Sequence, residues 1–169
     1  MNEPETPSPE PGGEDLLAAD LREELGDDLE SVSSAGGDLT LRVRRDALAA
    51  VCAGLKERHG FTYLVDLCGV DFPHREPRFE VVYHLYSFTA NRRVRLRVAT
   101  DAAVPVPSVS RVWRAAHGLE REVWDLFGVR FDGHPDLTRI LLWEGFEGHP
   151  LRKDFPVAGI ATGAARKTP

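Results

Sequence analysis

Residues 78–88, RFEVVYHLYSF, constrain the fold more than any other segment, because a run that is apolar on both faces predicts a central β-strand. Residues 61–69 are rich in aromatic and β-branched side chains, and residues 92–99 alternate Val or Leu with Arg. The same alternation marks residues 39–43. Residues 89–91 can form a tight hairpin turn between two of these segments. We therefore predict a mixed or antiparallel sheet of about four strands.

Helical periodicity accompanies these strands. Leucines spaced four residues apart predict an amphipathic helix over residues 14–25. A second helix follows Asp46, which we assign as its N-cap. The later pattern predicts a short helix near residues 109–116, which Gly118 separates from another over about 119–127. The order strand, helix, antiparallel meander is typical of an α+β fold with helices packed on one face of the sheet.

Composition divides the chain into four parts. Residues 1–13 are rich in Pro, Glu and Gly and predict a disordered acidic arm. Residues 14–104 form the expected α+β domain, and residues 105–156 form a helical and irregular segment that is dense in Gly, Pro, His, Asp and Arg. Residues 157–169 predict a flexible tail.

Charge and hydropathy limit the class of protein. Residues 1–30 carry 11 acids and one base, a net charge of −10, so the remaining residues carry +4 within a total of −6. The N-terminus lacks the basic and apolar regions of a signal peptide, and no apolar run approaches the ~20 residues of a membrane span. We therefore expect a cytoplasmic protein whose body is not basic enough to require nucleic acid.

The two cysteines, Cys52 and Cys68, exclude a four-cysteine iron–sulfur or zinc site within the chain. His134 and His149 are not part of any close set of His, Asp or Glu with ligand spacing, so we predict no metal and no cofactor in this chain.

The most informative stretch is Glu120–Pro156. On its helix, Arg121 and Asp125 are four residues apart and are expected to pair on the outside. Glu122 flanks the apolar face, so it is the acid expected to be partly buried, and it then needs a cationic partner. The candidate partners are Arg130, Arg139 and Arg152. The favoured interpretation is a structural latch that fixes a loop; direct contact with another subunit and acid–base catalysis are the alternatives.

Two rigid turns follow this helix. GHPDL and GHPLRKDFP each place a His between Gly and Pro, and proline restricts both its own φ and the residue before it. We expect His134 and His149 to support these turns. The stiffened segment would present Arg152, Lys153 and Asp154 with little loss of entropy on docking, so these three and His149 are the candidate subunit interface.

The same residues carry a family resemblance. The runs EREVWDLFG, FDGHPDL, RIL and EGHPLRKDFP resemble the signature of the thirty-kilodalton subunit family of respiratory complex I. The FTYLVDLCGVDF and RFEVVYHLYSF segments are also similar to that family, so the resemblance covers about residues 39–157. Within the signature, the latch candidates are Glu120, Arg121, Glu122, Asp125, His134 and Arg139.

The resemblance implies a cofactor-free subunit of the peripheral arm of a proton-translocating NADH:quinone oxidoreductase. Such a subunit packs beside the forty-nine-kilodalton-type subunit (the D subunit), near the B and I subunits and other peripheral-arm subunits. It lies on the cytoplasmic face of the bacterial inner membrane and associates with the membrane only through the complex. The holoenzyme uses FMN, Fe–S clusters and a quinone, and this chain would hold the quinone-reducing module together without catalysing a step.

Three further hypotheses come from related complexes and from unrelated classes of protein. The chain could be the equivalent subunit of a membrane-bound hydrogenase or of a photosynthetic-type NAD(P)H dehydrogenase. It could be an RNA-binding α+β domain, with an arginine-rich face and stacking aromatic side chains. It could be a free-standing enzyme that uses Glu122 and His134. The residues of the RNA-binding hypothesis are Arg42, Arg44, Arg93, Arg95 and Arg97, with Tyr86 and Phe88.

Overall fold

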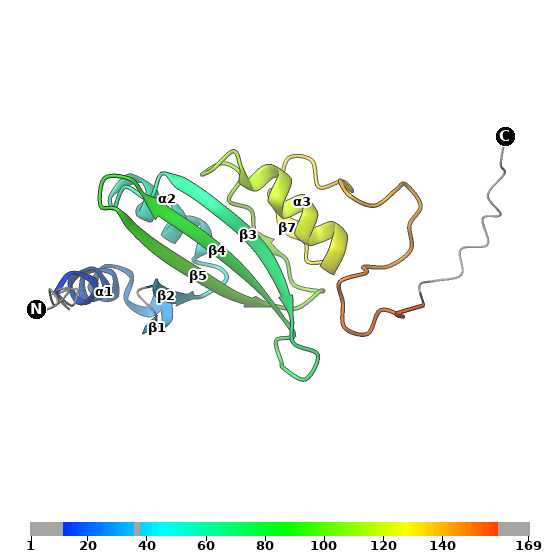
Figure 1. Cartoon of the computed structure of the whole chain (residues 1–169), viewed down its shortest axis with the longest axis horizontal. Coiled ribbons are helices and arrows are strands. Elements are labelled where there is room, and N and C mark those ends of the chain that lie inside the picture. The colour runs from blue at the N-terminus through cyan, green and yellow to red at the C-terminus, as the bar shows by residue number, and fades with distance from the viewer. Residues whose placement is uncertain (1–11, 36–37, 159–169) are drawn as a thin grey trace, which may run out of the picture.

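The computed structural model describes residues 12–35 and 38–158, and the arm expected at residues 1–13 and the tail at 157–169 lie mostly outside these ranges. Figure 1 shows one twisted sheet with helices beside it and an irregular C-terminal segment at one end. The helices are α1 (Gly12–Leu25), α2 (Leu48–Glu57) and α3 (Ala116–Phe127), with a 3₁₀ turn at Gly26–Asp28. The strands of the main sheet are β1 (Leu29–Ala35), β2 (Asp38–Val43), β3 (Tyr63–Asp71), β4 (Phe79–Ser87) and β5 (Arg92–Thr100).

The predicted α+β class is confirmed, with one strand more than expected. The sheet order is β1-β2-β5-β4-β3; β2 and β5 are parallel and the other neighbours are antiparallel. The segment predicted as a central strand, β4, lies in the interior of the sheet between β5 and β3. The sequence LESVSSA of β1 was not predicted, because it has few apolar residues and depends on the backbone ladder with β2.

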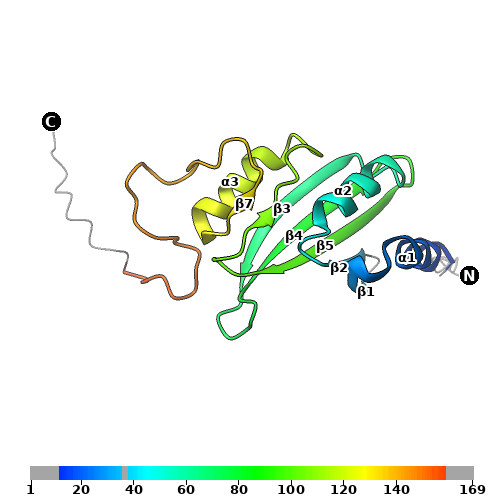
Figure 2. The same ribbon diagram turned by 180° about the vertical axis from the view of Figure 1, so that it is seen from behind.

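Both faces of the sheet follow from the period-two alternation. Figures 1 and 2, taken from opposite sides, show that α2 and α3 cover the same face. This inner face carries the core, in which α2 buries Leu48, Val51 and Leu55. The opposite face has no helix over it and carries polar and aromatic side chains. The main strand residues of the core are Leu39, Leu41, Val43, Leu67, Val81, Tyr83, Leu85, Val94, Leu96 and Val98.

Two local predictions were wrong. Asp46 does not cap α2: the N-cap is Ala47, without a side-chain hydrogen bond, and the Asp46 carboxylate pairs with Arg44 instead. Gly118 does not separate two helices, because α3 begins at Ala116 and runs through it, while residues 109–113 form only turns.

Among the described residues, none of the helices has the length and hydropathy of a membrane-spanning segment.

The chain after the sheet returns to α3 through a second, two-stranded parallel ladder. Val106–Pro107 (β6) pairs with Phe131–Asp132 (β7), so the segments that precede and follow α3 are tied together. Helix α3 itself packs on β3 at Gly69, where a methyl group would lie 2.8 Å from Cδ2 of Phe127 and 3.1 Å from Cγ1 of Val123. Glycine at this position therefore sets how closely α3 approaches the sheet.

A pair of glycine substitutions tests this packing. Gly69→Ala should lower the free energy of unfolding by about 1–3 kcal/mol, because the added methyl group overpacks the contact with α3. Gly118→Ala is the matched control, since no atom lies within 4 Å of its added Cβ, and it should raise stability by about 0.5–1 kcal/mol. Urea unfolding of the purified chain measures both; equal effects would contradict the proposed close approach.

Candidate subunit interface

Asp125 of α3 is the centre of the segment that the sequence marked as informative. Its side chain is fully buried, and its carboxylate Oδ1 accepts a hydrogen bond from Nη1 of Arg139. Its Oδ2 accepts three backbone N–H groups in succession, from Ile140 (3.1 Å), Leu141 (2.9 Å) and Leu142 (2.9 Å). Burial opposes ionisation, but these N–H groups and Arg139 outweigh it and lower the pKa of Asp125.

Arg139 extends the same network into residues 139–158, which we call the C-terminal arm. Its Nη2 donates to the carbonyl oxygen of Phe146 (2.8 Å), and its guanidinium lies over the rings of Trp124 and Phe146. Arg121, three residues before Trp124 on α3, donates to the carbonyl oxygens of Thr138 (3.0 Å) and Arg139 (2.8 Å). Thus the side chains of α3 bind the backbone of the first part of the arm.

The expectations for the acids of α3 need correction. Glu122 is exposed and is not the buried acid; Glu120 and Asp125 are buried instead. Arg121 and Asp125 do not pair on the outside, because the arm covers the side of the helix that carries them. A helical wheel built from apolar residues locates the sheet side of α3, but it does not account for an irregular segment on another side.

The arm also caps the C-terminus of α3. The carbonyl oxygen of Asp125 accepts Nδ1–H of His149 (2.9 Å), that of Leu126 accepts the backbone N–H of Leu151 (3.1 Å), and that of Phe127 accepts Nε–H of Arg152 (2.6 Å). These carbonyls have no partner within the helix, so the arm supplies one. Gly128, at φ +76°, lets the chain turn here, and a Cβ in its place would lie within 2.6 Å of His149 and Arg152.

A third attachment joins the end of the arm to the end of the sheet. Arg78 donates to both carboxylate oxygens of buried Asp71 (2.7 Å each) and to Asp154 (2.8 and 2.9 Å). The backbone N–H of Lys153 donates to Asp71 (2.7 Å). The hydrogen bonds from Arg78 lower the pKa of both Asp71 and Asp154. Sequence reasoning missed Asp71 and Arg78, because nothing local to them indicates a partner 76 residues away.

Of the four candidate interface residues, His149, Arg152 and Asp154 therefore contact this chain itself, and the side chain of Lys153 is exposed. The arm also presents large apolar side chains outward, beside exposed charged residues. Between residues 139 and 156 of the arm, four large apolar side chains are about half exposed or more, although their backbone is fixed by the contacts above. They are Ile140 (45%), Leu141 (58%), Trp143 (62%) and Leu151 (48%).

Glu120 and His134 fix the turns around α3. Fully buried Glu120 accepts hydrogen bonds from Ser108 Oγ (2.6 Å) and the backbone N–H of Val109 (2.7 Å), and His134 Nε2 lies 4.0 Å away. His134 accepts the N–H of Asp136 at Nδ1, so its Nε2–H donates to the carbonyl oxygen of His117. Burial without a close cation raises the pKa of Glu120 to about 7, and burial lowers the pKa of His134.

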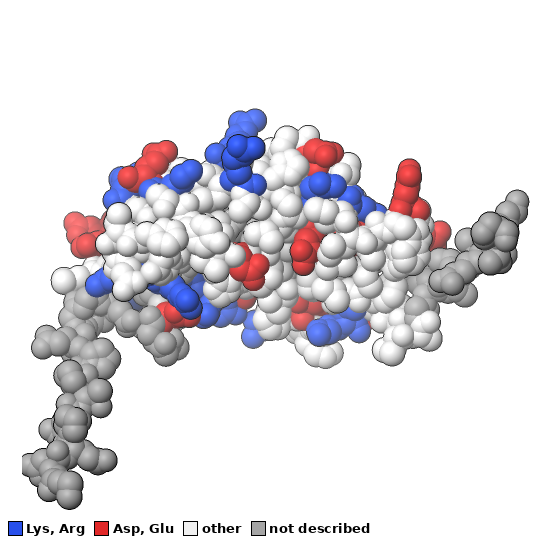
Figure 3. Space-filling model, turned by 45° about the horizontal axis from the view of Figure 1, so that its top comes forward, with Lys and Arg blue, Asp and Glu red and all other residues white. Residues whose placement is uncertain are grey.

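Glu122 and His134, proposed for a free-standing enzyme, do not hydrogen-bond to each other. Within residues 12–35 and 38–158, no group of His, Cys, Asp or Glu could hold a metal ion, and both cysteines are free thiols. The arginine-rich face is largely neutralised: Arg42 and Arg97 pair with Glu80, and Arg95 pairs with Asp38. In Figure 3, basic and acidic groups lie interspersed.

An α+β domain whose fixed arm exposes several large apolar side chains is typical of a component of a larger assembly. The chain belongs to the family of the 30 kDa subunit of respiratory-chain NADH dehydrogenase, whose model matches residues 41–161. The resemblance inferred from the sequence is thereby confirmed.

Individual proteins of this family are similar to most of the chain. The C subunit of the NADH-quinone oxidoreductase of Rhizobium johnstonii is 50% identical over 146 residues, which are 85% of this chain and 73% of that protein. The protein of the same name from Paramagnetospirillum magneticum is 56% identical over 125 residues, 73% of this chain and 63% of that protein. Among solved structures, a chain of the membrane-bound sulfane sulfur reductase, an archaeal respiratory membrane complex, matches with a TM-score of 0.73 and 26% identity over 85% of both chains.

Loss of the Asp125 carboxylate should release the arm. Asp125→Ala leaves Arg139 and three backbone N–H groups without their acceptor, so we expect a loss of about 2–4 kcal/mol in local stability. Hydrogen exchange of the amides of residues 140–142 measures this and should become at least about tenfold faster. Glu122→Ala, an exposed acid of the same helix, is the control. Unchanged exchange at 140–142 in the Asp125 variant would refute the latch.

The buried Glu120 predicts a pH dependence of stability. Its pKa is about 7 in the folded chain and about 4.3 in the unfolded chain, so the folded state binds more protons between these values. Stability should therefore fall as pH rises through this window, by on the order of 1–3 kcal/mol. Glu120→Gln removes the titration, so urea unfolding from pH 4.5 to 8 should show the variant gaining stability relative to the wild type. If the stabilities of the wild type and the variant changed in parallel with pH, Glu120 would not be the titrating group.

Proposed function

We propose that this chain is a cofactor-free structural subunit of the peripheral arm of a proton-translocating NADH:quinone oxidoreductase, on the cytoplasmic face of the bacterial inner membrane. The observation that carries the proposal is the family match over residues 41–161, which includes α3 and the whole of the C-terminal arm. Relatives that carry the name of the C subunit of NADH-quinone oxidoreductase cover most of the chain. FMN, the Fe–S clusters and the quinone are then held by other subunits.

The C-terminal arm is the proposed docking segment for the D subunit, with the B and I subunits close by. Exposed apolar side chains on a backbone that is already fixed lose little entropy on binding, and Trp is enriched among the residues that dominate interface energies. In this proposal Leu141 and Trp143 contact the partner directly. His149, Arg152 and Asp154 hold the arm in shape, and Lys153 contributes a charged contact at the rim.

A second candidate is the equivalent subunit of a related respiratory membrane complex, such as a membrane-bound hydrogenase or a photosynthetic-type NAD(P)H dehydrogenase. The observation that favours it is the fold similarity to a chain of the sulfane sulfur reductase complex at 26% identity. Co-purification decides between them. Gentle solubilisation of native membranes with the tagged chain should yield the D subunit together with cluster-bearing and NADH-oxidising subunits; hydrogenase subunits instead would favour the second candidate.

Assembly should depend on the exposed apolar residues of the arm. The double variant Leu141→Ser, Trp143→Ser should weaken retention of the D subunit at least about 30-fold, since dominant interface residues contribute about 2 kcal/mol or more each. Its isolated chain should melt near the wild-type temperature, because both side chains are more than half exposed. Leu16→Ser, similarly exposed on α1, is the matched control. Wild-type assembly of the double variant would exclude this docking surface.

A further inference from the structure

A second cluster of exposed apolar side chains lies at the other end of the sheet. Tyr63, at the start of β3, and Phe88, just beyond β4, are 50% and 67% exposed. Their rings pack at 5.7 Å between centroids, and Tyr86 meets Phe88 edge-to-face at 4.8 Å. Val65, 48% exposed, lies beside them on β3. We call Tyr63, Val65, Tyr86 and Phe88 the aromatic patch.

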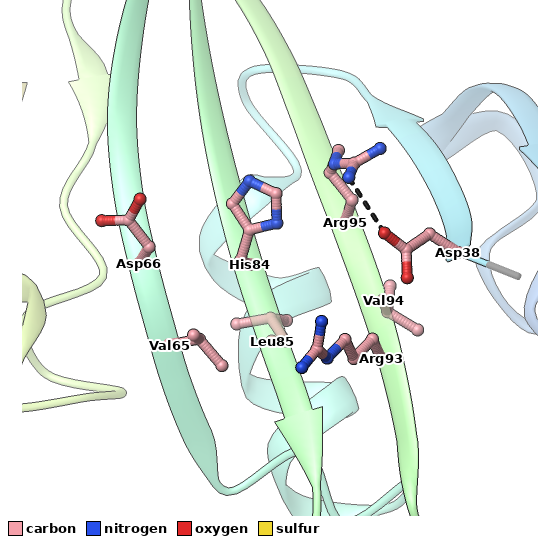
Figure 4. Close-up of a pocket in the computed structure, with 8 residues that line it drawn as sticks. All are labelled: Asp38, Val65, Asp66, His84, Leu85, Arg93, Val94 and Arg95. Atoms are coloured by element: carbon pink, nitrogen blue, oxygen red, sulfur yellow. Dashed lines mark hydrogen bonds and ion pairs between the residues drawn. The ribbon is translucent and has the colours of Figure 1, made fainter. Parts of the chain in front are cut away.

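The patch borders a hollow of about 320 Å³ on the helix-free face of the sheet, shown in Figure 4. Arg93 extends from β5 toward β4, whereas Arg95 turns away to Asp38 at 3.0 Å. The other arginines of this face, Arg42 and Arg97, each have a carboxylate partner. Among the residues that the structure describes, Arg93 has none and is exposed, so this face carries one uncompensated cation next to exposed aromatic rings.

We infer that the aromatic patch and Arg93 form a second docking surface, which receives a segment of another subunit that carries one carboxylate beside an apolar side chain. A carboxylate of that segment would pair with Arg93, and an apolar side chain beside it would pack on Tyr63, Val65 and Phe88. Charge complementarity selects this occupant: among the described residues, the hollow offers one guanidinium without a carboxylate partner. Aromatic and Arg side chains together are typical of interface centres. The inference rests on the proposed function, because it requires that the chain is part of a respiratory assembly.

A nucleic acid is a poorer occupant. The carboxylates of Asp38 and Asp66 line the same hollow, and both would repel phosphate groups. Figure 4 shows Asp66 beside His84 and Asp38 beside Arg95, so the hollow presents charges of both signs rather than a basic groove. A protein segment that brings a single carboxylate to Arg93 and an apolar side chain to the aromatic patch meets less repulsion than a chain of phosphate groups.

The surface is separate from the C-terminal arm. β4 runs from Phe79, next to the Arg78 attachment of the arm, to Ser87, next to Phe88. Eight residue steps of a strand span roughly 27 Å. Figure 1 likewise shows the β4–β5 turn and the arm at opposite ends of the sheet. Two docking surfaces that far apart on one rigid sheet allow the chain to bridge two subunits, or two distant regions of one subunit.

Photo-crosslinking in the intact, purified complex tests the inference. Benzoylphenylalanine in place of Phe88 should crosslink to a carboxylate-bearing segment of another subunit, which mass spectrometry of the product identifies. Arg93→Glu should lower the yield at least fivefold, and exchanging the carboxylate of the captured segment for Lys should restore it. The same probe at exposed Glu57, at the end of α2, is the background control.

Several outcomes would overturn the inference. Crosslinks to residues 1–11 of the same chain, to a second copy, or to ribonuclease-sensitive material each identify a different occupant. If the probe at Phe88 gives no crosslinked product while the probe at Leu141 captures a partner protein, the second docking surface is excluded. The proposed function is then unaffected. If no respiratory subunit co-purifies with the chain, the proposed function itself fails, and this inference fails with it. A wild-type melting temperature for Arg93→Glu shows that its effect is not a loss of folding.

Discussion

The arrangement of residues 120–156 depends on the carboxylate of Asp125. The C-terminal arm forms no regular helix or strand. Its backbone N–H groups therefore have no partners in secondary structure and need other acceptors. One buried carboxylate oxygen accepts three consecutive N–H groups, and the other accepts Arg139, whose guanidinium continues to the carbonyl of Phe146. A single side chain of α3 therefore substitutes for secondary structure over the first part of the arm.

This arrangement makes helix and arm interdependent. The last carbonyl oxygens of α3 accept hydrogen bonds from His149, Leu151 and Arg152 of the arm, while Asp125 of α3 holds the beginning of the arm. The far end is fixed by Arg78, which bridges Asp71 of the sheet and Asp154. With its backbone held from the inside at three places, the arm can leave Leu141 and Trp143 exposed without collapsing onto the core.

Sequence reasoning recovered what depends on local periodicity. The strands over 61–69, 78–88 and 92–99 and the leucine-spaced helix at 14–25 are present, since alternation and i, i+4 spacing directly report a buried face. It missed β1, whose sequence LESVSSA has only two large apolar residues and no clear alternation, and it chose Glu122 instead of Asp125. The partners of Asp125 and Asp71 include residues 14 and 82 positions away, at separations that no local pattern encodes. The family resemblance marked residues 120–156, where many of these contacts lie, but not the direction in which each side chain points.

The distribution of charge suggests how one small domain can serve two surfaces. Inside, cations are matched to buried carboxylates: Arg139 to Asp125, and Arg78 to Asp71. On the helix-free face, Arg42, Arg95 and Arg97 are matched as well, whereas Arg93, beside exposed aromatic rings, has no carboxylate partner among the described residues. An unpaired guanidinium at the surface costs little free energy in water, but its attraction to a carboxylate strengthens once water is excluded. An unpaired arginine is therefore expected where another chain covers the surface. The rigid sheet between Arg93 and the arm would then fix the distance between the two contacts.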